Sequence, residues 1–132
     1  FKDFNDTYGH ATGDRVLQTV AHAVKDTLRE PDVCSRHGGE EFAVLLPNTS
    51  GDSAYFVADR VRRTLRDTRY TGLGLPTEAN VTISIGVATC PRDATVLDEL
   101  MELADKALYQ AKADGRDTVV LWGAERRERV RM

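Results

Sequence analysis

Apolar residues in this chain follow two different periods in alternating segments, and this alternation limits the possible folds more than any other feature. Three segments repeat apolar residues every three or four positions, as amphipathic helices do: 14–28, 52–65 and 96–113. Three shorter runs are rich in β-branched and other apolar residues, as strands are: 42–46, 81–88 and 118–122. A fourth strand, 33–37, is expected because two glycines separate it from 42–46 and would let the two segments pair as a hairpin. This order predicts an α/β or α+β domain in which helices flank a central, mixed and mostly antiparallel sheet.

Short signals predict how the strands pair and pack. Gly38 and Gly39 separate the first two strands, and we expect both to adopt positive φ angles in a tight hairpin. The apolar run 42–46 predicts a strand that is buried on both faces. Large and small residues alternate in 81–88, so one face of that strand should admit close packing.

Other signals mark the helices. Thr95 and Asp98 resemble a capping box at the start of the third helix, and Gly115 is placed to end it. Three arginines of the second helix are expected to face mainly outward: Arg60, Arg62 and Arg63.

Composition narrows the class of protein. The chain has 132 residues, 41% hydrophobic and 30% charged, which predicts one soluble globular domain. A net charge of −3 offers little attraction to nucleic acid or anionic lipid, and no apolar run approaches the roughly 20 residues that span a bilayer. Cys34 and Cys90 lack metal-ligand spacing, and we expect both to be buried, reduced thiols.

Four motifs in one order carry a family resemblance. Residues 36–42 read RHGGEEF, and residues 1–14 read FKDFNDTYGHATGD. Residues 82–88 read TISIGVA, and residues 104–116 read ADKALYQAKADGR. With these motifs the chain is identified as a member of the GGDEF family, the diguanylate cyclases, in its GGEEF form. The resemblance implies a nucleotidyl-cyclase or polymerase-palm-like fold with a ferredoxin-like core.

The resemblance also implies a reaction, in which two GTP molecules on two facing domains condense into cyclic di-GMP and two pyrophosphates. Glu40 and Glu41 would be the catalytic carboxylates and would bind Mg²⁺ or Mn²⁺, because phosphoryl transfer needs a divalent cation and an oriented oxygen nucleophile. Gly38 and Gly39 would let the backbone approach the substrate phosphates. Without the companion motifs, the same acids would be a solvated turn.

Further substrate contacts are carried over from the matching motifs. Asn5 and Asp14 would read the guanine edge, although a cap and a helix N-terminal acid are their ordinary alternatives. His10 would lie near the substrate or pack in a turn. Three basic residues would bind the triphosphate and would otherwise be ordinary surface cations: Lys2, Lys112 and Arg116.

A second site is implied by Arg29-Glu30-Pro31-Asp32, which matches the R-x-x-D inhibitory motif of the family. Arg60 falls where the third residue of that site is expected. Two arginines can stack on guanine and bind phosphate while Asp32 accepts from the base, so cyclic di-GMP is the expected ligand. Binding there would inhibit the enzyme by holding domains in an unproductive geometry.

The resemblance also sets expectations for the whole protein. Residues 1–122 would be the cyclase domain and 123–132 a charged tail. The family pattern begins with a strand that supplies a metal-binding Asp and carbonyl, and this chain begins after it, so the 132 residues alone are expected to be inactive. We expect a homodimer, an upstream sensor or regulatory domain and a cytoplasmic location, with a possible membrane anchor in the parent protein.

Two alternatives remain at this point. A degenerate GGDEF module would bind GTP or cyclic di-GMP without turnover, although such modules usually lose the signature acids that Glu40 and Glu41 retain. A nucleotidyl cyclase or palm relative with a different product would share the fold, but not the guanine-reading pair and the R-x-x-D motif.

Overall fold

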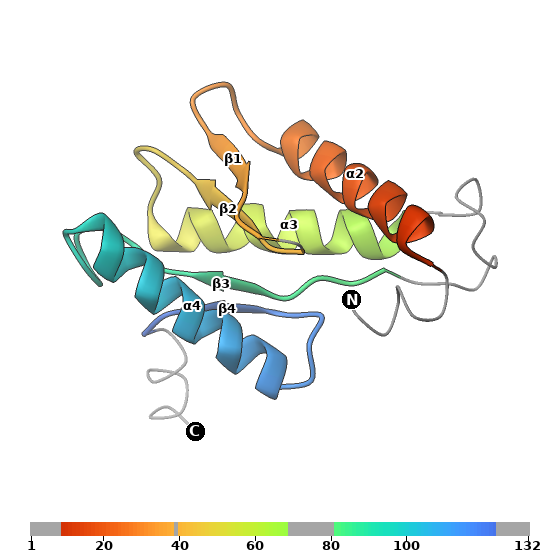
Figure 1. Cartoon of the computed structure of the whole chain (residues 1–132). Helices are drawn as coiled ribbons and strands as arrows, with labels where there is room; N and C mark the ends of the chain where they lie inside the picture. Colours follow the sequence, from red (N-terminus) through yellow and green to blue (C-terminus); the bar gives the residue numbers. More distant parts are fainter. Residues whose placement is uncertain (1–8, 39, 69–80, 124–132) are drawn as a thin grey trace. The chain divides into compact units, whose positions relative to one another are not determined.

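The computed structural model describes residues 9–38, 40–68 and 81–123. The chain divides into two compact units. We call Phe1–Pro47 with Thr64–Val81 the hairpin unit, and Asn48–Arg63 with Thr82–Met132 the crossover unit. Among the described residues each unit contains one two-stranded sheet, antiparallel in the hairpin unit and parallel in the crossover unit (Figure 1). The predicted mixed α/β architecture is confirmed.

Helix α2 (His10–Thr27) supplies much of the buried apolar surface of the hairpin unit. The predicted apolar stripe is buried at four positions, where the side chains are at most 6% exposed: Val16, Leu17, Val20 and Val24. The helix begins at His10 rather than at residue 14, because Gly9, with φ 89°, turns the chain and its carbonyl accepts from the amide of Gly13. The backbone hydrogen bonds of a first helical turn need no apolar side chains, so the apolar periodicity of the sequence did not reveal the first turn of α2.

Strands β1 (Val33–Arg36) and β2 (Phe42–Leu45) form the predicted antiparallel hairpin, in which Val33 lies opposite Leu45. The prediction that β2 is buried on both faces is wrong. Val44 is 43% exposed and Leu45 is 51% exposed. A short apolar run indicates a strand, but the layers that cover it are set by distant parts of the chain.

Three further elements and most of helix α3 (Gly51–Asp67) form the crossover unit, and the last turn of α3 belongs to the hairpin unit. Strands β3 (Ile85–Val87) and β4 (Val119–Leu121) pair in parallel, and helix α4 (Leu97–Ala113) connects them and packs on both (Figure 1). Parallel neighbours require such a crossover. β3 is shorter than the predicted 81–88, because only residues 85–87 pair with β4.

Glycine at position 86 allows β3 to lie directly against α4. A Cβ at Gly86 would overlap the carbonyl oxygen of Ala104 and the amide of Leu108. The close packing expected for one face of this strand is therefore confirmed. Ala107 and Ala111 are fully buried beside Val120, and this core brings the small-residue face of α4 onto the sheet.

Sequence signals predicted the C-terminal end of α4 correctly but not its N-terminal end. Val96 is the N-cap and no side chain caps the helix, so the predicted capping box is wrong. The C-terminal prediction is confirmed: Gly115 has φ 111° and donates to Lys112 (3.4 Å), while Arg116 donates to Ala111 (3.0 Å). These two bonds form a Schellman motif.

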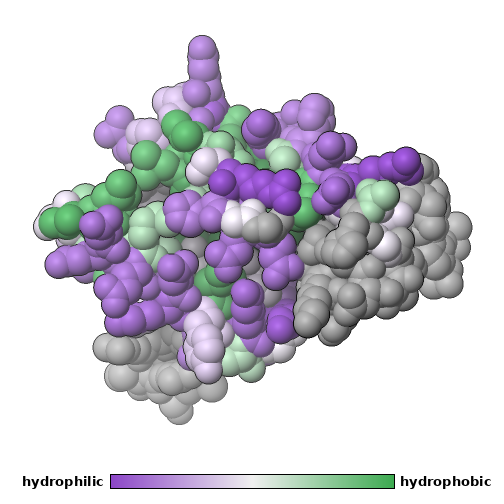
Figure 2. All heavy atoms as spheres, viewed as in Figure 1, coloured by the Kyte–Doolittle hydropathy of each residue, from purple (hydrophilic) through white to green (hydrophobic). Residues whose placement is uncertain are grey.

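Hydrophilic side chains cover most of the described surface in the view of Figure 2, with apolar patches between them. The large apolar side chains with the greatest exposure are Phe56 (69%), Leu97 (61%) and Tyr109 (76%). The amphipathic pattern of 96–113 predicts that its apolar residues, Leu97 included, face the core, and this is wrong for Leu97, which lies in the first turn of α4, away from the buried residues Ala107 and Ala111. None of the helices within the described ranges is long and apolar enough to cross a bilayer.

Candidate functional site

The RHGGEEF motif forms the end of the β1–β2 hairpin. The amide of His37 donates to the carbonyl of Glu41 (2.8 Å), one step beyond the last paired residues of the two strands. Arg36 Nε donates to the carbonyl of Gly38 (3.2 Å), which ties the side chain of β1 to the turn itself. The motif is thus presented on a turn that is held from both strands.

Gly38 and the two glutamates are exposed at this turn. Apart from Gly38 itself and its two chain neighbours, no heavy atom of the described residues lies within 4 Å of the place where a Cβ would stand on Gly38, so its backbone is open to approach. The expected positive φ is wrong for Gly38, because the loop between the strands has room for an ordinary turn and does not need a two-residue one. Gly39 lies outside the described residues.

Glu40 and Glu41 offer carboxylate oxygens, which are the donors that Mg²⁺ takes. Within the described ranges, no group of three or more His, Cys, Asp or Glu side chains gathers to hold a metal ion. Mg²⁺ is commonly held by one or two carboxylates and completes its shell with water and substrate phosphates. Two adjacent exposed glutamates fit that donor set, with the remaining ligands coming from elsewhere.

The first turns of α2 carry Asp14 and His10. Asp14 is exposed, and it lies beyond the first turn, which contains no acidic residue. A helix-dipole role for Asp14 is therefore weak, because that effect is confined to the first turn. Its exposed carboxylate remains available to a ligand. His10 is the first residue of α2, and Lys2 and Asn5 lie outside the described residues.

Two of the three predicted triphosphate contacts, Lys112 and Arg116, lie where α4 ends. Lys112 is in the last turn of the helix and is exposed, so it also complements the negative end of the helix dipole. Arg116 is exposed and has a positive φ of 65°. The Schellman motif thus brings both cations to the same helix end.

Arg29 and Asp32 meet in the turn between α2 and β1. The Asp32 carboxylate accepts from the Arg29 amide (2.9 Å) and lies 3.6 Å from its guanidinium. Arg29 Nη2 also donates to the carbonyl of Pro47 (3.4 Å). The Asp32 side chain is 2% exposed and that of Arg29 is 62% exposed, so the carboxylate anchors an accessible cation. Arg60 is exposed on the part of α3 that belongs to the crossover unit.

An open depression of about 330 Å³ lies beside this pair. Its lining combines two cations, a carboxylate, a thiol and two apolar side chains: Lys25, Leu28, Arg29, Asp32, Val33 and Cys34. Oδ1 of Asp32 is buried there without a hydrogen-bond donor. Cys34 is half-buried, and burial raises its pKa while the charge of Lys25 opposes the rise.

Both cysteines are free, as predicted, but the expected burial is wrong for Cys90, which is exposed. Cys90 lies in the connection that follows β3, where it precedes Pro91 through a cis peptide bond. The residue type of Cys90 predicts burial, but it carries no information on whether the segment after β3 lies in the core or at the surface.

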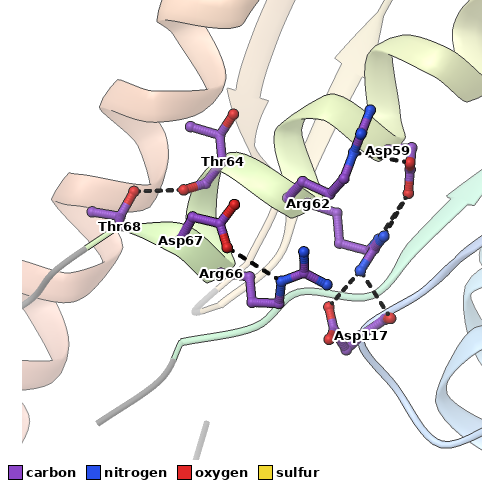
Figure 3. A network of polar contacts seen from close by, with 8 residues as sticks. Asp59, Arg62, Thr64, Arg66, Asp67, Thr68 and Asp117 are labelled. Atoms are coloured by element: carbon purple, nitrogen blue, oxygen red, sulfur yellow. Dashed lines mark hydrogen bonds and ion pairs between the residues drawn. The ribbon is translucent and has the colours of Figure 1, made fainter. Parts of the chain in front are cut away.

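Sequence reasoning missed an arginine network centred on Arg62, which was expected to face outward. The Arg62 side chain is only 15% exposed. Its Nη2 lies 2.8 Å from Asp59 Oδ1, and its Nη1 donates to Asp117 Oδ1 at 3.0 Å (Figure 3). Burial would lower the pKa of Arg62, but hydrogen bonds and charges from Asp59 and Asp117 outweigh it and raise that pKa. The i,i+3 spacing of Asp59 and Arg62 is a sequence signal for a helical ion pair, whereas no sequence signal links Arg62 to Asp117, 55 positions away.

Comparison with known proteins supports the motif-based assignment. Residues 1–118 match the family described as diguanylate cyclase, GGDEF domain. Diguanylate cyclase A of Treponema denticola is 46% identical over 123 residues, which cover 92% of this chain and 32% of that protein. The chain spans between about a quarter and a third of the length of such curated relatives.

Solved structures agree in fold. The active GGEEF domain of a diguanylate cyclase from Vibrio cholerae superposes with a TM-score of 0.83 at 27% identity, covering 92% of this chain and 75% of that one. The GGDEF domain of DgcB from Caulobacter crescentus, solved with c-di-GMP, gives 0.78 at 31% identity, covering 91% and 70%. With a motif-bearing hairpin, a family match over most of its length and these shared folds, the chain belongs to the diguanylate cyclase GGDEF-domain family.

Proposed function

We propose that this chain forms the catalytic domain of a diguanylate cyclase, an enzyme that condenses two GTP molecules into cyclic di-GMP. The observation that carries the proposal is the end of the β1–β2 hairpin, where an open glycine backbone is followed by two exposed carboxylates, Glu40 and Glu41. The family membership and the naming of relatives as diguanylate cyclases support it.

In the proposed reaction, the 3′-hydroxyl oxygen of each GTP bonds to the α-phosphorus of the other. The bond from that phosphorus to the bridging oxygen breaks, and pyrophosphate leaves. Glu40, with Glu41 beside it, would accept the hydroxyl proton, and the two would hold Mg²⁺ or Mn²⁺. A bound cation would neutralise the negative charge of the substrate phosphates. The open backbone of Gly38, with Gly39 next to it, would lie against the phosphates.

Recognition of GTP is assigned to two groups of side chains. Asn5 and Asp14 would pair with the guanine edge, because an amide and a carboxylate together match its acceptor and donors. Triphosphate oxygens would be bound by Lys112 and Arg116, both exposed at the end of α4, together with Lys2. His10 would lie beside the nucleotide.

One domain holds one half of the symmetric product, so the proposal requires two copies that face each other. A regulatory domain elsewhere in a longer protein would control their encounter, as the relatives are several times longer than this chain. The cytoplasm is the proposed location, because it holds the GTP pool.

Cyclic di-GMP is the proposed ligand of Arg29 and Asp32 in the turn between α2 and β1. The anchored and accessible guanidinium of Arg29 beside an open depression supports this assignment. The DgcB GGDEF domain was solved in complex with c-di-GMP, which makes the same ligand a reasonable one here.

The reaction is tested by incubating the full protein that contains these residues with GTP and Mg²⁺ and separating the nucleotides. We expect cyclic di-GMP, and we expect Glu40→Gln to lower its rate by at least about 100-fold, as loss of a general base does. Glu99→Gln, an exposed carboxylate in the first turn of α4, is the matched control and should keep the parental rate. Unchanged GTP would make the domain a binding module, and cyclic GMP would make it a different cyclase.

A further inference from the structure

Three consecutive residues after α4 adopt positive φ angles. They are Gly115 (111°), Arg116 (65°) and Asp117 (45°). Glycine enters this region without strain, but a side chain with a Cβ is unfavourable there, and two such residues in a row persist only when their surroundings hold them. The direction in which Arg116 leaves the backbone therefore depends on what fixes its neighbours.

The residues before Arg116 are fixed by the helix. Gly115 and Arg116 both donate backbone hydrogen bonds to the last turn of α4, as the Schellman motif requires. One position past Asp117, the carbonyl of Thr118 accepts from Ile85 at 3.0 Å, where the turn joins the parallel ladder. Asp117 is the residue between these two anchors.

Asp117 is held by Arg62 of α3. Nη1 of Arg62 donates both to the carboxylate (3.0 Å) and to the backbone carbonyl (3.4 Å) of Asp117 (Figure 3). This double contact spans 55 positions of sequence and fixes the backbone as well as the side chain. All of these residues belong to the crossover unit.

Arg62 is itself prevented from turning away. Its Nε donates to Asp59 Oδ1 (2.9 Å) one turn earlier on α3, and the other oxygen of Asp59 pairs with Arg63 at 3.2 Å. The side chain of Arg62 is 15% exposed and that of Asp59 is 23% exposed, so water competes little for these contacts. Asp59 therefore aims the guanidinium of Arg62 at Asp117.

We infer that Arg62 is a positioning residue for nucleotide binding: by holding Asp117 it fixes the left-handed turn from which Arg116 reaches the substrate phosphates. The inference rests on the proposed function, in which Arg116 binds triphosphate. It assigns a role to a partly buried ion pair that touches no substrate. A guanidinium placed in advance loses less entropy when it binds an anion, so the effect falls on substrate affinity.

Steady-state kinetics of the full protein with GTP tests the inference. Arg62→Ala and Arg116→Ala are each expected to raise KM for GTP about tenfold, the size of one charge-assisted hydrogen bond, with a smaller change in kcat. The double variant should match Arg116→Ala alone, because Arg62 acts through Arg116. Urea unfolding of each variant identifies any that do not fold.

Two variants of Asp117 separate positioning from bulk stability. Asp117→Asn keeps an oxygen acceptor and tolerates a positive φ, so it should keep the parental KM. Asp117→Ala loses the side-chain oxygen acceptor and the tolerance of a positive φ, so it should raise KM as Arg62→Ala does. It also provides the test of the positioning role if Arg62→Ala fails to fold. Arg63→Ala is the matched control and should leave KM unchanged, because among the described residues Arg63 pairs with Asp59 but forms no hydrogen bond or ion pair with Asp117.

The outcomes are distinct. An active parent in which Arg62→Ala and Asp117→Ala leave KM unchanged, or in which the effects of Arg62→Ala and Arg116→Ala add in the double variant, overturns the positioning role alone. A parent that makes no cyclic di-GMP overturns the proposed function and, with it, this inference.

Discussion

Arg29 and Asp32 form an unequal pair: the carboxylate of Asp32 is 2% exposed, whereas the guanidinium that it holds at 3.6 Å belongs to a side chain that is 62% exposed. Such a pair gives little stability as a surface ion pair, because water screens the exposed partner. It is suited to recognition, because an accessible cation is kept in one place by a buried anchor. The depression beside it provides room for a ligand.

Calorimetry with cyclic di-GMP tests this pair. Arg29→Ala should weaken binding at least about tenfold through loss of charge-assisted hydrogen bonds, and Asp32→Asn should weaken it because the anchor of Arg29 is lost. Arg66→Ala is the control, because it removes a partly exposed arginine that pairs with its neighbour Asp67. Parental affinity in Arg29→Ala would show that the ligand binds elsewhere.

Gly86→Ala should destabilise the crossover unit. The new Cβ would overlap the backbone of α4 at Ala104 and Leu108, which cannot move aside as a side chain can. Overpacking of this kind costs about 1–3 kcal/mol, measured as a loss in the free energy of urea unfolding. Gly38→Ala is the control, because its Cβ would stand in open space and its φ is not left-handed, so stability should not fall. Equal stability of the two variants would contradict the close packing of β3 on α4.

The Asp59–Arg62 pair should matter more for stability than the Arg66–Asp67 pair. Asp59→Ala removes a partner of a guanidinium that is 15% exposed, and loss of a bond to a charged group costs about 1.5–3 kcal/mol of unfolding free energy. Asp67 is 71% exposed, so Asp67→Ala should cost less than about 0.5 kcal/mol. Chemical denaturation of the two variants gives the comparison, and a larger loss for Asp67→Ala would refute it.

The two free thiols should react at different rates. Burial raises the pKa of Cys34 despite the charge of Lys25, so less of it is thiolate near neutral pH, and it is only half-exposed. Iodoacetamide should therefore modify the exposed Cys90 first, as followed by mass spectrometry of peptides. The rate at Cys34 should therefore keep rising with pH beyond about 8.5, the ordinary cysteine pKa near which the rate at an unperturbed thiol begins to level off. Lys25→Ala, which removes the opposing charge, should slow Cys34 further, whereas faster labelling of Cys34 than of Cys90 would contradict the burial.

Much of the fold could be predicted because its signals are local. Period, breaker residues and strand composition identified every helix and strand that the described residues contain, to within a few positions. Gly115 was correctly expected to end α4, since a left-handed C-terminal residue is a property of a few neighbouring residues. Thr95 and Asp98 show the limit of such signals, because the helix began without a side-chain cap.

For the candidate site, motif spacing placed Glu40 and Glu41 at the hairpin end and joined Arg29 to Asp32, both short-range relationships. It could not find that Arg62 turns inward, because its partner Asp117 lies 55 positions away. Helical periodicity assigned Arg62 to the solvent side, and a partly buried ion pair overrides that assignment when geometry satisfies both charges.

Hydrogen bonds along the backbone and apolar periodicity act between near neighbours, so the order of helices and strands, the hairpin and its acidic motif were already encoded in the linear chain. Burial and ion pairing act between segments that meet only after folding. For this reason the exposure of Leu45 and Cys90, the contact of Gly86 with α4 and the hold of Arg62 on Asp117 emerged from the folded structure alone.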